Sequence, residues 1–561
     1  MALTKLGNTA FTTVPASVLS GPIPSARFPV ALPAVSGANL TNLPKSGGVV
    51  TATANGSITA GKTVILNSNG MVSEIAATPI AQAIGSEYTQ SGETTCEVNQ
   101  LVYDTTNNVF IWGGKNTISA SNTGRTYALA MDSSLNITEA APPVTAAGIQ
   151  NNAWSGIYDA TMNRAIFHGT NSSAHVTACT VQYVSGVMKV SPTITWKASN
   201  YPYGFSRGFD ADELMAAYQS NQSNLKLAFV DATLGSDASG DSFANFTSEI
   251  DPDELDSTDA SDAYYSQIIP FTSVSKYLIG NFAYRSTGAD YAFEFAVGTI
   301  GGSSGGSRTF TKQSGGIITS GGVSDSGVSV STDPVGFTSA GRVRYDATKD
   351  RAFVFDSEFL YSISVNSSGV ASCSPLTTIQ AADETANMRD VFSIPNSDHL
   401  VLFYADQSNS NRATYRVVTH NKGATAAADT FVLEGSAVEI NTDAVALQYT
   451  PIAYSPDIDA FMIKPYRSSV AQPFYGIRVA RTTTNVKATG VTGRYLGVAT
   501  ASVSSGQQAE IAVQGSTVTM AAGGMTIGDT YYPQNDGTVG TTDKGFGTAG
   551  IAVSATELLL E

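Results

Sequence analysis

The stretch VRYDATKDRAFVFD (residues 343–356) holds two strand-like runs around a short polar turn. Asp and Asn side chains hydrogen-bond to their own backbone and tolerate left-handed geometry, so Tyr-Asp-Ala-Thr-Lys-Asp predicts a turn. The β-branched and aromatic residues on either side are typical of strands. The stretch therefore predicts a β-hairpin.

The same pattern recurs along the chain. Clear copies are LVYDTTNNVFIWGG (residues 101–114), GIYDATMNRAIFHG (156–169) and IAYSPDIDAFMIKP (452–465), and weaker ones begin at residues 208, 270 and 392. Seven anchors mark the copies: Tyr103, Tyr158, Phe209, Phe271, Tyr345, Ile394 and Tyr454. They are separated by 55, 51, 62, 74, 49 and 60 residues, and another strand-like run follows each hairpin.

Such units predict an all-β fold with a propeller-like body of about seven blades, because one small sheet cannot bury both of its faces alone. A propeller of six or eight blades and a β-sandwich array remain alternatives. We expect this body to span residues 97–481. Small β-modules are expected at residues 46–96 and 482–561, and Asp536-Gly537 marks a turn in the second. A further alternative is that both modules belong to one unit that the propeller splits.

The segment of residues 1–45 is rich in proline, which lacks a backbone N–H and cannot pair in a central strand. It has no helical period either. We therefore expect an extended arm that gains structure against another surface.

Composition narrows the classes of function. The chain of 561 residues carries 46 acidic and 30 basic side chains, a formal charge of −16. Such a chain repels nucleic acid, because binding a phosphate backbone needs clustered Lys and Arg side chains. Charged residues make up 14 %, against about 25 % in an ordinary soluble domain, and neutral hydroxyls, amides and 52 glycines replace them. That profile favours an extracellular or virion β-protein over a cytosolic enzyme. No secretion signal and no apolar run long enough to span a membrane is recognised.

No catalytic, cofactor or metal site is predicted. The histidines, His168, His175, His399 and His420, lack the spacing of metal ligands, and the acidic segment at residues 249–262 does not match an EF-hand loop. Residues 302–306 match Gly-x-Ser-x-Gly, but no helix-forming run follows them. The cysteines, Cys96, Cys179 and Cys373, are expected to be reduced. We therefore expect that the chain is not an enzyme.

Segments near the two ends of the sequence, at residues 25–44 and within 506–560, resemble parts of bacteriophage virion proteins. SARFPVALPAVSGANLTNLP (residues 25–44) resembles the short arms of bacteriophage virion proteins, especially tail-fibre-like ones. Three stretches near the other end look like a terminal β-module of phage fibre and decoration proteins: GQQAEIAVQGSTV (506–518), GMTIGDTYYPQNDGTVG (524–540) and GIAVSATELLL (550–560).

The resemblance implies a structural protein on the outside of a bacteriophage particle, tail-fibre-like, assembled in the host bacterial cytoplasm. We expect the arm to dock on other virion proteins through the apolar side chains Phe28, Leu32, Leu40 and Leu43. The propeller-like body would then contact the host surface, where loops rich in amides and hydroxyls suit a glycan. Fibres of this class are commonly homotrimers, although no heptad repeat supports that here.

Two alternatives stay open. One is a head fibre or capsid decoration protein with the same parts. The other is a propeller glycan hydrolase, a depolymerase. Residues 120–127 (ASNTGRTY) are only weakly similar to the Asp-box of sialidases.

Overall fold

A computed structural model was obtained for the chain. It describes residues 48–561 except for short gaps at 68, 91–98, 117–122, 150–151, 171–175, 198–200, 208–212, 221–223, 245–259, 286–289, 303–307, 320–321, 326–341, 356–358, 380–388, 396, 407–411, 445–450, 466–472, 485–493, 521–522, 535 and 542–546. The described residues form strands, turns and three short 3-10 helices, η4 (Ala147–Ile149), η5 (Ala238–Gly240) and η6 (Ala426–Ala428). Within these residues no helix is long and apolar enough to cross a membrane.

Seven antiparallel sheets form the blades of a propeller, and this confirms the predicted all-β, propeller-like body. Blade 1 contains β6 (Asn99–Asp104), β7 (Val109–Asn116), β8 (Thr123–Met131) and β9 (Ile137–Thr145), and blade 2 contains β10 (Asn152–Asp159), β11 (Arg164–Thr170), β12 (Val176–Val184), β13 (Val187–Val190) and β14 (Ile194–Lys197). Blade 3 contains β15 (Tyr201–Arg207), β16 (Glu213–Ser220), β17 (Asn224–Thr233) and β18 (Ser242–Ala244). Blade 4 contains β19 (Ala260–Phe271), β20 (Lys276–Arg285), β21 (Asp290–Gly301), β22 (Thr309–Thr319) and β23 (Gly322–Asp325).

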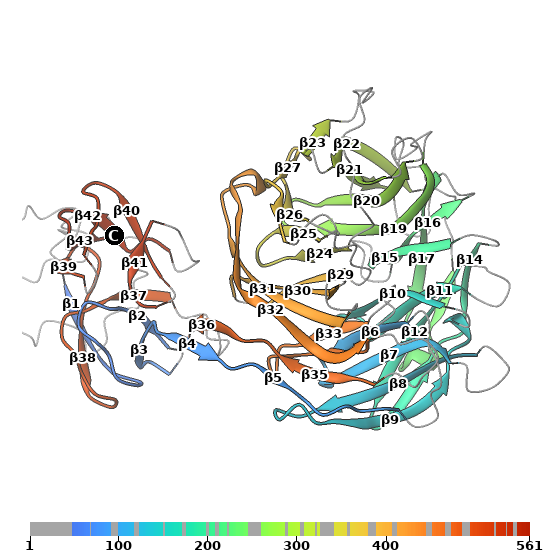
Figure 1. The fold of residues 1–561 in the computed structure, drawn as a ribbon, viewed down its shortest axis with the longest axis horizontal. Helices are drawn as coiled ribbons and strands as arrows, with labels where there is room; N and C mark the ends of the chain where they lie inside the picture. Colours follow the sequence, from blue (N-terminus) through green and yellow to red (C-terminus); the bar gives the residue numbers. More distant parts are fainter. Residues whose placement is uncertain are drawn as a thin grey trace, which may run out of the picture.

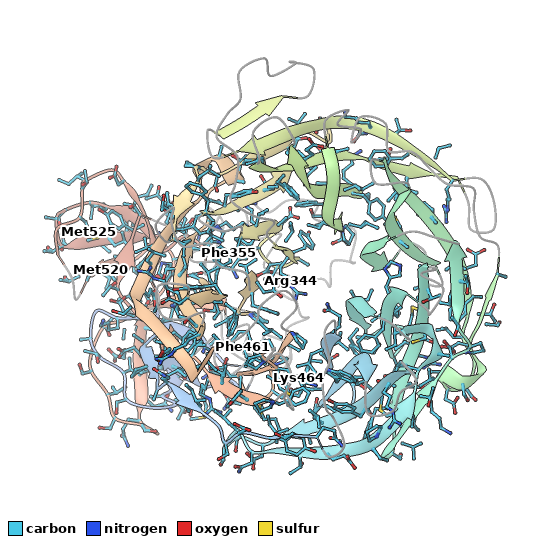
Figure 2. The ribbon with its side chains drawn as sticks, turned by 45° about the vertical axis from the view of Figure 1, so that its right-hand side comes forward. Arg344, Phe355, Phe461, Lys464, Met520 and Met525 are labelled. Carbon is cyan, nitrogen blue, oxygen red and sulfur yellow. The ribbon has the colours of Figure 1, made fainter. Side chains whose placement is uncertain are left out.

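Blades 5 to 7 continue the ring. Blade 5 contains β24 (Arg342–Asp346), β25 (Arg351–Phe355), β26 (Phe359–Val365), β27 (Ala371–Cys373) and β28 (Thr377–Thr378). Blade 6 contains β29 (Arg389–Ser393), β30 (His399–Asp406), β31 (Arg412–Asn421) and β32 (Thr430–Ala444). Blade 7 contains β33 (Ile452–Ser455), β34 (Ala460–Ile463), β35 (Tyr475–Arg478) and β5 (Ala83–Ile84). First strands of neighbouring blades contact one another around the axis of the ring, so the first strand of each blade is the innermost (Figure 2).

Each seam between neighbouring blades has its own hydrophobic core. Seven separate clusters of buried side chains fill the seven seams, and each draws on two adjacent blades. Between blades 6 and 7, for example, the ring centroids of Phe403 and Phe461 lie 5.1 Å apart. Radial stacking therefore buries the faces that a lone sheet would leave in water.

The recurring Tyr-Asp turn has a clear structural basis. In blade 5 the Asp346 carboxylate accepts backbone N–H bonds from Thr348 and Lys349 at 2.8 and 3.0 Å, which closes the turn. Asp350 ends it in the left-handed region, at φ 53°, and its side chain accepts the Tyr345 hydroxyl at 2.8 Å. The same geometry holds Asn163 beside Tyr158, where the hydroxyl bond is 2.9 Å. The recurring Tyr, Asp and Asn residues thus fold these hairpins locally.

Blade 7 is completed from the other end of the chain. Its outermost strand is β5, which pairs with β35 through Ile84↔Ile477 and Ala83↔Arg478. One blade therefore joins strands almost 400 residues apart and closes the ring. The body expected at residues 97–481 lacks this strand, because a two-residue Ala-Ile strand has no pattern that sequence reasoning can recognise.

Strands from both sides of the propeller form one base module, shown at the left of Figure 1. Its two sheets contain β1 (Val49–Thr53), β38 (Gln508–Ala512), β37 (Arg494–Ala499), β2 (Thr63–Leu66) and β3 (Val72–Glu74), and β39 (Thr517–Thr519), β43 (Glu557–Leu560), β42 (Gly550–Ala552), β40 (Thr530–Pro533) and β41 (Val539–Gly540). A two-stranded ribbon, β4 (Ala77–Ile80) with β36 (Arg481–Thr484), joins this module to blade 7.

Candidate functional site

The topology sorts the connections of the propeller onto two faces. Because the strands of each blade are antiparallel, connections between first and second strands lie at one face, and those between second and third strands lie at the other. The ribbon to the base module leaves blade 7 between its third and fourth strands, β35 and β5. That exit lies at the face of the Tyr-Asp turns.

The opposite face receives the connections richest in amides and hydroxyls. Residues 117–122, 171–175, 221–223 and 407–411 join second to third strands in blades 1, 2, 3 and 6. These connections themselves lie outside the described residues, but the strand ends that they join are described. The base module and these polar connections therefore belong to opposite faces of the propeller.

The predicted docking side chains, Phe28, Leu32, Leu40 and Leu43, lie outside the described residues. The first described residue after them, Gly48, sits on the base module, where its carbonyl accepts the backbone N–H of Val513 at 3.0 Å. The segment that carries these side chains therefore joins the chain at the base module.

Most other residues singled out in the sequence are scattered. His168 is fully buried in blade 2, and burial lowers its pKa to about 3. His399 and His420 lie in blade 6, whereas His175, Cys96 and most of the acidic segment at 249–262 are outside the described part. Cys179 and Cys373 are free thiols in blades 2 and 5. Across the described ranges no three His, Cys, Asp or Glu side chains gather closely enough to hold a metal ion.

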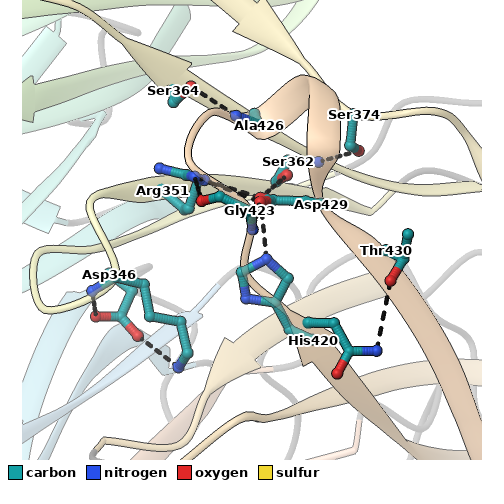
Figure 3. Close-up of polar contacts among 12 residues, drawn as sticks. Asp346, Arg351, Ser362, Ser364, Ser374, His420, Gly423, Ala426, Asp429 and Thr430 are labelled. Atoms are coloured by element: carbon teal, nitrogen blue, oxygen red, sulfur yellow. Dashed lines mark hydrogen bonds and ion pairs between the residues drawn. The ribbon is translucent and has the colours of Figure 1, made fainter. Parts of the chain in front are cut away.

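A buried polar cluster that the sequence reasoning missed joins blades 5 and 6 (Figure 3). We call it the Asp429 cluster; it comprises Arg351, Ser362, Ser374, His420, Gly423 and Asp429. The Asp429 carboxylate lies 2.8 Å from Arg351 Nε, 2.7 Å from Ser362 Oγ and 2.7 Å from the Gly423 backbone nitrogen. His420 Nε2 is 2.9 Å from the same carboxylate. Both oxygens of the Asp429 carboxylate thus accept hydrogen bonds.

The charge state of the cluster follows from these contacts. Burial alone would raise the pKa of Asp429, but hydrogen bonds from His420, Arg351 and Ser362 outweigh it and lower this pKa to about 2. Burial also lowers the pKa of His420, against the opposing effect of the Asp429 carboxylate. The cluster therefore holds an ionised carboxylate, a guanidinium and a neutral imidazole.

A second cluster of the same design joins blades 2 and 3. The Asp241 carboxylate lies 2.9 Å from Arg164 Nε, 2.6 Å from Thr180 Oγ1 and 2.9 Å from the Gly235 backbone nitrogen. Behind it, Ser191 Oγ accepts the Thr180 backbone N–H at 2.9 Å, as Ser374 does for Ser362. We call this the Asp241 cluster.

A sequence signal for both clusters exists, although it is short. Residues 235–242 (GSDASGDS) and 423–430 (GATAAADT) share Gly, Ala, Asp and a hydroxyl residue at the same spacing. In each copy the first Gly and the Asp bond to one another around a 3-10 turn, η5 or η6. The arginine of each cluster, Arg164 or Arg351, comes from the preceding blade, 77 or 78 residues before the aspartate. No local sequence pattern can therefore predict this contact.

Both clusters are closed to solvent. The side chains of Arg351 and Asp429 are 3 % and 0 % exposed, and those of Arg164 and Asp241 have the same values. Although Ser362, Asp429 and His420 are residue types found in hydrolases, the aspartate lies between the serine and the histidine, and no substrate can reach them. The arrangement suits holding neighbouring blades together rather than chemistry on a ligand.

Among the described residues, two further polar arrangements can be reached by solvent. On the innermost strands, Arg344 forms a two-pronged ion pair with Asp390, at 3.0 and 2.6 Å, and its guanidinium lies 4.7 Å from the Phe392 ring (Figure 2). A cavity of about 510 Å³ separates blade 6 from the ribbon. Its lining includes Tyr415, Glu434 and Arg481. A hydrogen bond from His399 is the main cause that lowers the pKa of Glu434.

The chain was compared with known sequences and solved structures. No family model and no curated protein matches the sequence. Among solved structures, the chain is similar to the periplasmic gluconolactonase of Pseudomonas aeruginosa, with 10 % identity, a TM-score of 0.41, and coverage of 71 % of this chain and 97 % of that one. It is also similar to a β-propeller domain from Myceliophteria thermophila, with 11 % identity, a TM-score of 0.42, and coverage of 71 % and 100 %.

These similarities correct one expectation. The prediction that the chain is not an enzyme is wrong as an exclusion, because the structures that it resembles include a gluconolactonase. The fold therefore gives no ground for excluding catalysis. At 10 % identity the likeness concerns the fold alone, and neither a substrate nor a catalytic residue is carried over to this chain.

Proposed function

We propose that the chain is a structural protein on the outside of a bacteriophage particle, tail-fibre-like, which docks by its N-terminal arm and binds the host surface with its propeller. The observation that carries the proposal is the opposition of two faces. The base module, where the arm joins at Gly48, leaves the propeller at one face, and the amide-rich connections belong to the other. A protein held at the base would present those connections outward.

The chemistry of the connections favours a polar partner. Residues 117–122, 171–175, 221–223 and 407–411 are dominated by Ser, Thr, Asn and Gln, whose hydroxyls and amides both donate and accept hydrogen bonds. The hydroxyl groups of a cell-surface glycan need such partners. The formal charge of −16 makes nucleic acid an unsuitable partner. We infer that other virion proteins and a host glycan are the two partners, and that the assembled form is a homotrimer.

Two variants separate docking from host binding. Deletion of residues 1–45 is expected to leave a folded protein that no longer enters particles. Replacement of residues 221–223 and 407–411 by Gly and Ser is expected to preserve incorporation and to reduce adsorption to host cells. Incorporation is measured by blotting purified particles and adsorption by counting free particles. Normal incorporation of the truncated protein would refute the docking role of the arm.

Further measurements decide between the alternatives. An antibody against the protein, located in electron micrographs of particles, places it on tail or head and so separates the fibre from a head decoration protein. Incubation of the purified protein with host capsular polysaccharide tests catalysis directly. Release of shortened chains would show that the propeller degrades its glycan and would replace the simple binding role.

A further inference from the structure

The junction between ribbon and propeller is a continuous pair of strands with a break in its hydrogen bonding. Pairing of β4 with β36 ends at Ile80↔Arg481, and pairing of β5 with β35 begins at Ala83↔Arg478. The register is the same on both sides. The pairs that would lie between them, from Ala81, Gln82, Val479 and Ala480, belong to neither strand pairing.

Two contacts hold backbone groups at this break: the Arg481 side chain donates to the Val479 carbonyl oxygen at 3.3 Å, and the Ala480 backbone bonds to the Tyr415 hydroxyl. Ala81, Gln82 and Ala480 are exposed, and only Val479 is buried, in the core between blades 6 and 7. Exposed residues without ladder bonds can change φ and ψ without losing packing, which is what a hinge requires. The break is therefore a structurally weak point between two well-packed bodies.

The hydrophobic cores on the two sides are separate. The clusters of the base module contain only base residues, and the seven seam clusters contain only propeller residues. The cavity of about 510 Å³ lies between Ile80, Ala480 and Arg481 of the ribbon side and Tyr415, Glu434 and Val438 of blade 6. The ribbon thus does not pack closely against the blade beside it.

An ion pair spans this junction. The Arg481 guanidinium, at the first residue of β36, donates to both carboxylate oxygens of Asp459. Asp459 ends the first turn of blade 7 at φ 52° and also accepts the Tyr454 hydroxyl at 2.6 Å. The Arg481 side chain is 3 % exposed and the Asp459 side chain 31 % exposed, so this pair is partly shielded from solvent and ties the ribbon to blade 7.

We propose that the break at residues 81–82 and 479–480 is a hinge between the base module and the propeller, and that the Arg481–Asp459 pair is the latch that holds it at one angle. This inference does not rest on a place in a virion. It concerns how the two bodies of this chain move relative to one another, whatever each of them binds.

Asp459→Asn is the sharpest test, because it removes the charge and keeps the turn. Asn occupies the same left-handed position in two other blades, as Asn108 and Asn163, so the backbone geometry is preserved. Small-angle X-ray scattering of the whole chain is the measurement. We expect the unchanged protein to fit one arrangement of base and propeller, and the Asp459→Asn variant to require a mixture of arrangements.

Two further variants make the test decisive. Asp390→Asn disrupts the ion pair with Arg344, which links blades 5 and 6 and does not span the junction, and it should leave the scattering unchanged. A disulfide between Ala81→Cys and Ala480→Cys, opposite one another in the continued register, should restore a single arrangement to Asp459→Asn when oxidised. A single arrangement for Asp459→Asn without the disulfide, or an equal change in Asp390→Asn, would overturn the proposal.

Discussion

Asp429 and Arg351 are two opposite charges placed where water cannot reach them, and their partners decide what each change costs. Asp429→Asn leaves the Arg351 guanidinium buried without a counter-charge, and we expect it to lower the free energy of unfolding by about 3–5 kcal/mol. His420→Ala should cost clearly less, because Ala232 stands at the equivalent position, three residues before Gly235, in the Asp241 cluster. Denaturant unfolding followed by circular dichroism gives both values. Equal costs would show that the imidazole is as necessary as the carboxylate.

The same cluster makes stability depend on pH. The pKa of Asp429 is lowered from 3.8 to about 2, so folding favours the ionised form. Its contribution, about 2 kcal/mol, is fully present above pH 4 and is lost as the pH falls from 4 to 2. The cost of Asp429→Asn should therefore shrink as the pH falls below 4. A cost that stays constant down to pH 2 would contradict the lowered pKa.

His420 acts in the same direction at higher pH. Because burial lowers the pKa of this imidazole in the folded state, the unfolded chain binds a proton more readily. Stability should therefore fall as the pH drops below the ordinary histidine value of about 6.5. Comparing His420→Ala with the unchanged protein at pH 7 and pH 5 isolates this contribution. We expect the cost of His420→Ala to be smaller at pH 5 than at pH 7.

At the scale of the elements, the closing strand of blade 7 depends on close approach of two backbones. A Cβ added to Gly85 would lie 2.4 Å from the Leu135 carbonyl oxygen of blade 1, which belongs to a tight turn and cannot move aside. Gly85→Ala is expected to destabilise the propeller by about 1–3 kcal/mol through this overlap. The neighbouring exposed Ser86 gives the control, since Ser86→Ala should change the melting temperature little. An unchanged melting temperature for Gly85→Ala would mean that the closure is loose.

The elements also show what sequence reasoning can reach. Hairpins such as that of Tyr345, Asp346 and Asp350 are encoded within six residues, so their recurrence predicted the blades and the fold class. The partner of β35 could not be predicted, because β5 is two residues long and its pairing spans the whole propeller. The Arg351–Asp429 contact was missed for the same reason: its two residues are 78 positions apart and meet only when blades stack. Turns are encoded by neighbouring residues and can be predicted from the sequence, whereas contacts between blades depend on how the folded blades stack.

At the scale of the whole molecule, two bodies with separate cores are expected to unfold in two steps. Leu558 is fully buried in the base, and Phe403 is fully buried between blades 6 and 7. Replacing either by Ala removes buried apolar contacts at a cost of about 2–5 kcal/mol, and this cost is confined to the body that loses them. Differential scanning calorimetry should therefore show two transitions. Leu558→Ala should lower only one and Phe403→Ala only the other, whereas a single transition that both variants lower would mean that the ribbon couples the two bodies into one cooperative unit.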